Sequence, residues 1–75
     1  MITLNESNYG SLLRDMRIEN NLSQKELSSL TGISESCISK IENQKISPTI
    51  STYLRLVHEL GYVISIEGNN SSYNF

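Results

Sequence analysis

The stretch SQKELSSLTGISESCISKIE, residues 23–42, decides the fold of this chain. Ser23 and Glu26 have the spacing of a capping box, in which each side chain bonds the other residue's amide at the start of a helix. Gly32 predicts the end of that helix, because glycine adopts the left-handed backbone conformation at little steric cost. Ser34 then caps another helix. The stretch therefore predicts two short helices joined by a tight turn.

A supporting helix is predicted on each side of this stretch. From about residue 8 to residue 20, and again from Ser47 to Gly61, apolar side chains recur at spacings of three and four, which is typical of amphipathic helices. The pair Asn20-Asn21 ends the first of these helices and Gly61 ends the second, since both residue types tolerate the left-handed conformation. We therefore expect an all-α bundle of four to five helices.

Residues 62–67, YVISIE, change the period of the apolar pattern from 3.6 to 2, which predicts a β-strand. An isolated strand is not stable, so it pairs either with residues 2–4 or with the same strand of a second copy. We favour the second copy, because a two-fold axis lets two identical strands satisfy each other's hydrogen bonds. The tail over residues 68–75, GNNSSYNF, is polar and is predicted to be flexible. The predicted dimer interface consists of Tyr62, Val63, Ile64 and Ile66.

Length and composition narrow the class of protein. The 75-residue chain holds one small domain, and chains of this length are marginally stable alone. The single cysteine, Cys37, excludes an internal disulfide, and the single histidine, His58, leaves no ligand cluster for structural zinc. We therefore expect oligomerisation, no metal and no cofactor. One histidine without a catalytic motif predicts a protein that is not an enzyme and has no small-molecule substrate. The expected segments are an N-terminal extension (1–7), a helical domain (8–61), a dimerisation strand (62–67) and a flexible tail (68–75).

Location and charge add two further expectations. No apolar run approaches the roughly 20 residues of a membrane span, and the N-terminus lacks the basic and apolar regions of a signal peptide. We therefore expect a cytoplasmic, nucleoid-associated protein without a membrane partner. Six Lys and Arg against eight Asp and Glu give a net charge of −2, which predicts modest non-specific affinity for nucleic acid. Cations nevertheless lie in or beside the central stretch, at Arg17, Lys25, Lys40 and Lys45.

The central stretch has the chemistry of a DNA reader. In a helix-turn-helix unit the second helix lies in the major groove, where base edges present distinct donors and acceptors. On its outward face Lys40 can donate to guanine, Glu35 can accept from cytosine, and serine hydroxyls can do either. The predicted base-reading residues are Glu35, Ser36, Ser39 and Lys40. Phosphate contacts are predicted around the start of the first helix and the end of the second, at Ser23, Gln24, Lys25, Asn43 and Lys45.

The combination of residues in this stretch resembles the XRE, or lambda-repressor-like, helix-turn-helix family. The resemblance covers about residues 8–61, including the segment PTISTYLRLVHELG. It implies that Gln24 contacts a phosphate, and that Arg17 and Glu42 form a buried ion pair that ties the first predicted helix to the third. The chain departs from the family at Ser28, where the family usually has Ala. The matching positions are Ser23-Gln24, Glu26-Leu27, Gly32-Ile33-Ser34, Ile38-Ser39 and Ile41-Glu42.

The strand that follows the last predicted helix, in LGYVISIEG, is similar to that of HipB-like antitoxins. That resemblance implies a repressor that binds a palindromic operator as a dimer, regulates its own operon and neutralises a HipA-like toxin. Tyr73 and Phe75 would then be candidate toxin contacts. Three alternatives stay open, namely a phage repressor, a restriction-modification controller protein, and a toxin-binding module with a minor DNA role.

Overall fold

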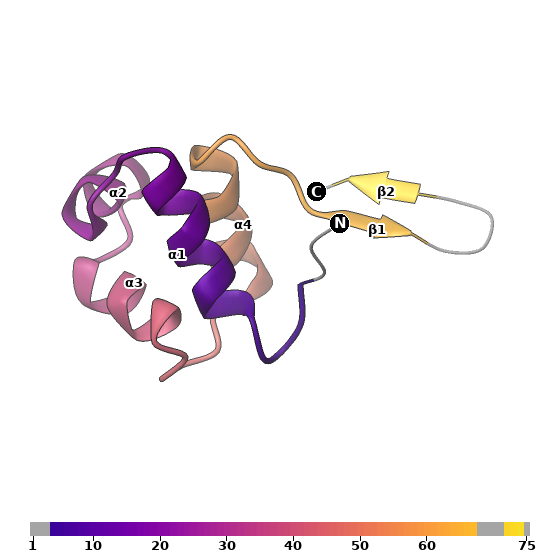
Figure 1. Ribbon diagram of the computed structural model, residues 1–75, viewed down its shortest axis with the longest axis horizontal. Coiled ribbons are helices and arrows are strands. Elements are labelled where there is room, and N and C mark those ends of the chain that lie inside the picture. The colour runs from indigo at the N-terminus through magenta and orange to yellow at the C-terminus, as the bar shows by residue number, and fades with distance from the viewer. Residues whose placement is uncertain (1–3, 68–71, 75) are drawn as a thin grey trace.

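The computed structural model describes residues 4–67 and 72–74. Within them the chain forms four helices followed by two short strands, and the strands project from one side of the helical bundle (Figure 1). This arrangement confirms the expected all-α domain with a C-terminal strand. The elements are α1 (Tyr9–Glu19), α2 (Gln24–Thr31), α3 (Glu35–Glu42), α4 (Ile50–Glu59), β1 (Ser65–Glu67) and β2 (Ser72–Asn74).

One apolar core holds the helices together. The helix α3 packs against α1 and α2, while α4 packs against α2 and α1. One side of α3 is therefore covered, and the other faces away from the bundle (Figure 1). Leu13, Leu27, Ile38, Ile41 and Leu56 are completely buried, and burial of each contributes about 1.5–3 kcal/mol. The remaining members of the buried core are Met16, Tyr53, Val57 and Leu60.

Three helices, α1, α3 and α4, end in the same way, with a left-handed residue one position beyond the C-cap, whereas α2 has a left-handed residue, Gly32, at the C-cap itself. Such a residue turns the chain back so that the next amide bonds a carbonyl of the helix. The left-handed residues are Asn21 after α1, Gln44 after α3 and Gly61 after α4, with φ angles of 56°, 57° and 86°. The ends at Asn21 and Gly61 agree with the sequence. Gln44 was not anticipated, because a side chain usually disfavours this conformation.

The start of α4 differs from its prediction. The predicted helix runs from Ser47, but α4 begins at Ile50, and its N-cap is Thr49, whose hydroxyl accepts from the Thr52 amide at 3.2 Å. Ser47 and Thr49 are both good caps, so the sequence offers two starting points. The loop before α4 is tied to α1, because the Tyr9 hydroxyl donates to the carbonyl of Ile46 at 2.8 Å. This contact is consistent with use of the later cap.

The C-terminal strand has a partner within its own chain, which corrects the sequence prediction. β1 pairs antiparallel with β2, with Ser65 opposite Asn74 and Ile66 opposite Tyr73. Residues 72–74 of the tail form β2, and the flexibility expected of residues 68–75 stays a prediction. Residues 2 and 3 and residues 68–71 lie outside the described part of the chain. Pairing across a dimer stays a prediction.

The strand is also shorter than predicted, because its first residues complete the end of α4. The Tyr62 amide donates to the Val57 carbonyl at 3.1 Å. Tyr62 and Ile64 are half-buried and pack against the core, whereas Val63 is 65% exposed. The predicted alternation is present, but the Tyr62 and Ile64 side chains already have apolar contacts within the chain. We refer to residues 62–67 and 72–74 together as the C-terminal arm.

Candidate nucleic-acid interface

The turn between α2 and α3 has the geometry that its sequence predicts. The Ser23 hydroxyl accepts from the Glu26 amide at 3.0 Å, and the Glu26 carboxylate accepts from the Ser23 amide at 2.9 Å. The hydrogen bond that the Glu26 carboxylate accepts from the Ser23 amide, followed by its interaction with the Ser23 side chain, holds the pKa of Glu26 below its usual value. Gly32 has a φ of 76° and ends α2. The Thr31 hydroxyl accepts from the Ile33 amide at 3.2 Å, which closes the turn.

The predicted base-reading residues lie together on the outward side of α3. At 3.6 residues per turn, positions 35, 36, 39 and 40 fall within about 140° of the helix circumference. Glu35, Ser36 and Lys40 are exposed and Ser39 is half-buried. Ile38 and Ile41 project to the opposite side and are completely buried. The helix therefore presents a polar surface while its apolar side anchors it in the core.

The buried carboxylate of Glu42 connects three helices. Its side chain is completely shielded from solvent, and Arg17 binds it through two nitrogens, Nε to Oε2 at 2.7 Å and Nη2 to Oε1 at 2.9 Å. Gln24, at the start of α2, donates to Oε1 at 3.1 Å. The structure thus contains the Arg17–Glu42 pair that the family resemblance implies. A two-point guanidinium–carboxylate contact fixes orientation as well as distance.

The electrostatics of this pair keep Glu42 ionised. Burial alone raises the pKa of a carboxyl group, but hydrogen bonds from Arg17 and Gln24 and the positive charge of Arg17 outweigh burial here. The pKa of Glu42 is therefore held below its usual value of 4.5. The hydrogen bond to Glu42 correspondingly raises the pKa of Arg17. Both groups are charged at neutral pH, and α1 and α3 are joined by a full ion pair.

Arg14 is a residue of this site that the sequence reasoning missed. Its Nη2 donates to the Asn43 side-chain oxygen at 2.9 Å, and its Nε lies 3.4 Å from Glu42 Oε1. The Asn43 side-chain nitrogen in turn donates to the Ser39 carbonyl at 2.9 Å. Arg14 is one helical turn before Arg17 and shares its face of α1. That three-residue spacing was the signal available in the sequence.

The predicted phosphate contacts occupy two groups around α3. Ser23, Gln24 and Lys25 lie at the start of α2, and Asn43 and Lys45 lie just after α3. Lys25 and Lys45 are exposed. The side chains of Gln24 and Asn43 instead hydrogen-bond within the protein, to Glu42 and Ser39 respectively. Contact of these five residues with DNA phosphates stays a prediction.

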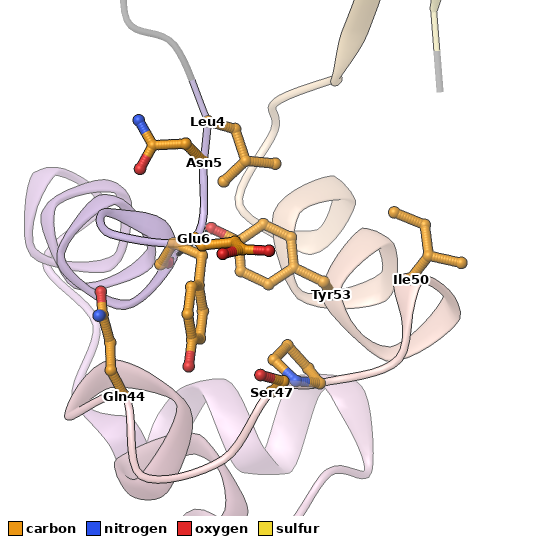
Figure 2. Close-up of a pocket in the computed structure, with 9 residues that line it drawn as sticks. Leu4, Asn5, Glu6, Gln44, Ser47, Ile50 and Tyr53 are labelled. Carbon is orange, nitrogen blue, oxygen red and sulfur yellow. Dashed lines mark hydrogen bonds between the residues drawn. The ribbon is translucent and has the colours of Figure 1, made fainter.

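The first turn of α1 holds the segment that follows α3. The backbone amide of Gly10 donates to Gln44 Oε1 at 3.2 Å, and Figure 2 shows the Gln44 side chain reaching from the loop toward α1. A methyl group at Gly10 would lie 2.6 Å from the carbonyl oxygens of Ile41 and Glu42. Glycine is therefore required for the close approach of α1 to the end of α3.

An open groove lies beside this contact, between the N-terminal segment and the start of α4 (Figure 2). Leu4 and Ile50 project toward it from opposite sides, and Glu6 is the charged residue of its lining.

Among residues 4–67 and 72–74 no three His, Cys, Asp or Glu side chains are grouped to hold a metal ion. No helix in the described ranges is long and apolar enough to cross a membrane.

Comparisons with known proteins agree with this geometry. A family model described as a helix-turn-helix domain matches residues 10–71. The HTH-type transcriptional regulator PuuR of Escherichia coli (strain K12) and its namesake from Shigella flexneri are each 39% identical over 56 residues. The matched region is 75% of this chain but only 30% of the length of these relatives. From the family match and this identity, the chain belongs to the XRE-type, lambda-repressor-like helix-turn-helix family.

Proposed function

We propose that this chain binds operator DNA through α3 and acts in transcriptional regulation as a sequence-specific repressor. The observation that carries the proposal is the outward polar face of α3, which is anchored by buried Ile38 and Ile41 and by the Glu42 ion pair. An α-helix with a polar outward face fits the major groove. The relatives that match this chain are transcriptional regulators by name, which supports the same assignment.

The distribution of charge supports a specific rather than a general DNA binder. The chain carries a net charge of −2, so long-range attraction to phosphate is weak. Lys25, Lys40 and Lys45 nevertheless lie on or beside the helix-turn-helix unit, and all three are exposed. Local contacts and base reading would then supply most of the affinity for an operator. We therefore expect the affinity for DNA to fall only slightly as the salt concentration rises.

Base reading by Lys40 gives a direct test of the proposal. The operator is first located by footprinting on the DNA upstream of the chain's own gene. Replacement of Lys40 by Ala should weaken operator binding by about 1–3 kcal/mol and relax the preference at one base pair. Arg55→Ala, at an exposed position on α4, is the matched control. Equal losses on operator and on random-sequence DNA would rule out base reading by Lys40.

We further propose that the working unit is a homodimer joined through the C-terminal arm. Each strand of the arm has three residues, and a two-stranded sheet is marginal alone. Val63 beside it is 65% exposed, so a second copy would cover apolar surface as well as strand edges. Such a dimer reads a near-palindromic site with half-sites about one helical turn, roughly 34–36 Å, apart.

The finer assignment that we propose is an antitoxin that represses its own operon and neutralises a HipA-like toxin. Tyr73 is 59% exposed on β2, where it can meet a protein partner, whereas Phe75 lies outside the described residues. Replacement of Tyr73 by Ala should weaken binding to the product of the adjacent gene and spare operator binding. Asn74→Ala on the same strand is the control. An adjacent gene for phage or restriction functions would favour those alternatives instead.

A further inference from the structure

Arg14 carries a positive charge in excess of the one that balances the Glu42 carboxylate. Arg17 already binds that carboxylate through two nitrogens at 2.7 and 2.9 Å. Arg14 Nε is 3.4 Å from Oε1, a length at which a hydrogen bond is weak. The Arg14 side chain is 41% exposed, against 13% for Arg17. Two guanidinium groups around one carboxylate leave a local charge of +1, and Arg14 is the member exposed to solvent.

The strongest hydrogen bond of Arg14 places this charge at the end of α3. Its Nη2 donates to Asn43 at 2.9 Å, and it also lies 3.4 Å from the carbonyl of Glu42. Asn43 is fixed in turn by its bond to the Ser39 carbonyl. The guanidinium therefore lies beside the segment that leads to Lys45, and it is held there by groups on α3.

We infer that Arg14 contacts a DNA phosphate and extends the interface from the helix-turn-helix unit onto α1. The inference rests on the proposed function. A guanidinium can keep its bond to Asn43 through one nitrogen and donate to a phosphate oxygen through another. The contact adds a positive charge to the DNA-binding surface of a chain whose net charge is −2. Arg14 supplies affinity that does not depend on base sequence, because phosphates carry no base information.

Salt titration of binding to a random-sequence DNA duplex tests this contact. Loss of one phosphate contact lowers the slope of log affinity against log salt by about 0.9. Arg14→Gln, which removes the charge, should show that decrease, whereas Arg14→Lys should retain the parent slope. Arg55→Gln makes the same charge change at an exposed position on α4 and should leave the slope unaltered. Melting temperatures establish that each variant is folded.

The outcomes separate the inference from the function on which it rests. If the parent chain binds DNA and Arg14→Gln keeps the parent slope, the inference is wrong and the proposed function stands. Equal decreases for Arg14→Gln and Arg55→Gln would also overturn it, since net charge would explain both. If the parent chain binds no DNA, the inference and the proposed function both fail.

NMR of the parent chain tests the same contact without a variant. The Arg14 Nε–H resonance should shift on addition of duplex DNA, and an unshifted resonance would overturn the contact.

Discussion

The helical bundle and the C-terminal arm are stabilised in different ways. The bundle encloses completely buried side chains and the shielded carboxylate of Glu42. The arm has two strands of three residues, and it projects from the bundle (Figure 1). Its exposed apolar residues include Val63 and Tyr73, at 65% and 59%. The bundle therefore has a buried core of its own, whereas the arm leaves apolar side chains exposed to solvent.

The same contrast suggests a division of roles. The polar face of α3 belongs to the rigid bundle, where buried anchors fix its orientation. Apolar groups left exposed on the arm are suited to contacts with another protein. Substitutions in the bundle should therefore change folding or DNA binding, and substitutions in the arm should change association.

The largest expected effect is that of Glu42→Ala. It leaves Arg17, whose side chain is only 13% exposed, without its carboxylate partner. Removal of one partner of a buried pair costs about 3–5 kcal/mol, a large share of the roughly 4–11 kcal/mol available to a domain of this size. The free energy of unfolding in urea measures the loss. Glu35→Ala, on the exposed surface of the same helix, should cost less than about 1 kcal/mol.

Gly10→Ala should destabilise the bundle by about 1–3 kcal/mol, the usual cost of overpacking. The new methyl group would lie 2.6 Å from two backbone carbonyl oxygens of α3, and backbone cannot move as easily as a side chain. Ser11→Ala at the adjacent exposed position is the control. Equal stability of the two variants by urea denaturation would mean that α1 and α3 are not held at this distance.

Acid should weaken the bundle through Glu42. The folded-state pKa of this group is lowered, so its stabilising contribution is fully present above the unfolded value of about 4.5 and is lost as pH falls through the folded pKa. Glu42→Gln lacks the titrating group and should lose less stability over that range. Urea denaturation at a series of pH values compares the two proteins. Parallel curves below pH 4.5 would show that the ion pair does not contribute to acid stability.

The smallest expected change in folding is that of Val63→Lys. Val63 is 65% exposed, so the unfolding free energy of the bundle at low protein concentration should change by no more than about 0.5 kcal/mol. A charge at the proposed interface should instead dissociate the dimer. Sedimentation measures the association state. This position is a cleaner test than Ile64, which packs against the core. A Val63→Lys dimer as stable as the parent would exclude the proposed interface.

Sequence reasoning succeeded where local chemistry fixes structure. The capping box of Ser23 and the left-handed Gly32 depend on residues within a few positions of one another, so the turn could be predicted. The Arg17–Glu42 pair came from the family resemblance and is present at 2.7 Å. The main partner of Arg14, Asn43, is 29 residues away, so the sequence held a local signal only in the three-residue spacing of Arg14 and Arg17.

The arm shows where local patterns are insufficient. Alternation in residues 62–67 predicted a strand but did not identify its partner. Glycine and asparagine residues at 68–70 are typical of turns, and this was the available signal for a hairpin with residues 72–74. Tyr62 is compatible with both a strand and the end of a helix. The hydrogen bond from its amide to the Val57 carbonyl places it at the end of α4. Such choices depend on tertiary contacts that a short alternating pattern does not encode.

Amide chemical shifts on addition of operator DNA test whether α3 binds DNA, since they compare α3 and the arm within one molecule. We predict the largest shifts at Gln24 and over residues 35–40, where α2 and α3 would contact the duplex. Much smaller shifts are expected at Val63 and Tyr73 on the arm. The largest shifts in the arm, with residues 35–40 unchanged, would contradict DNA reading by α3.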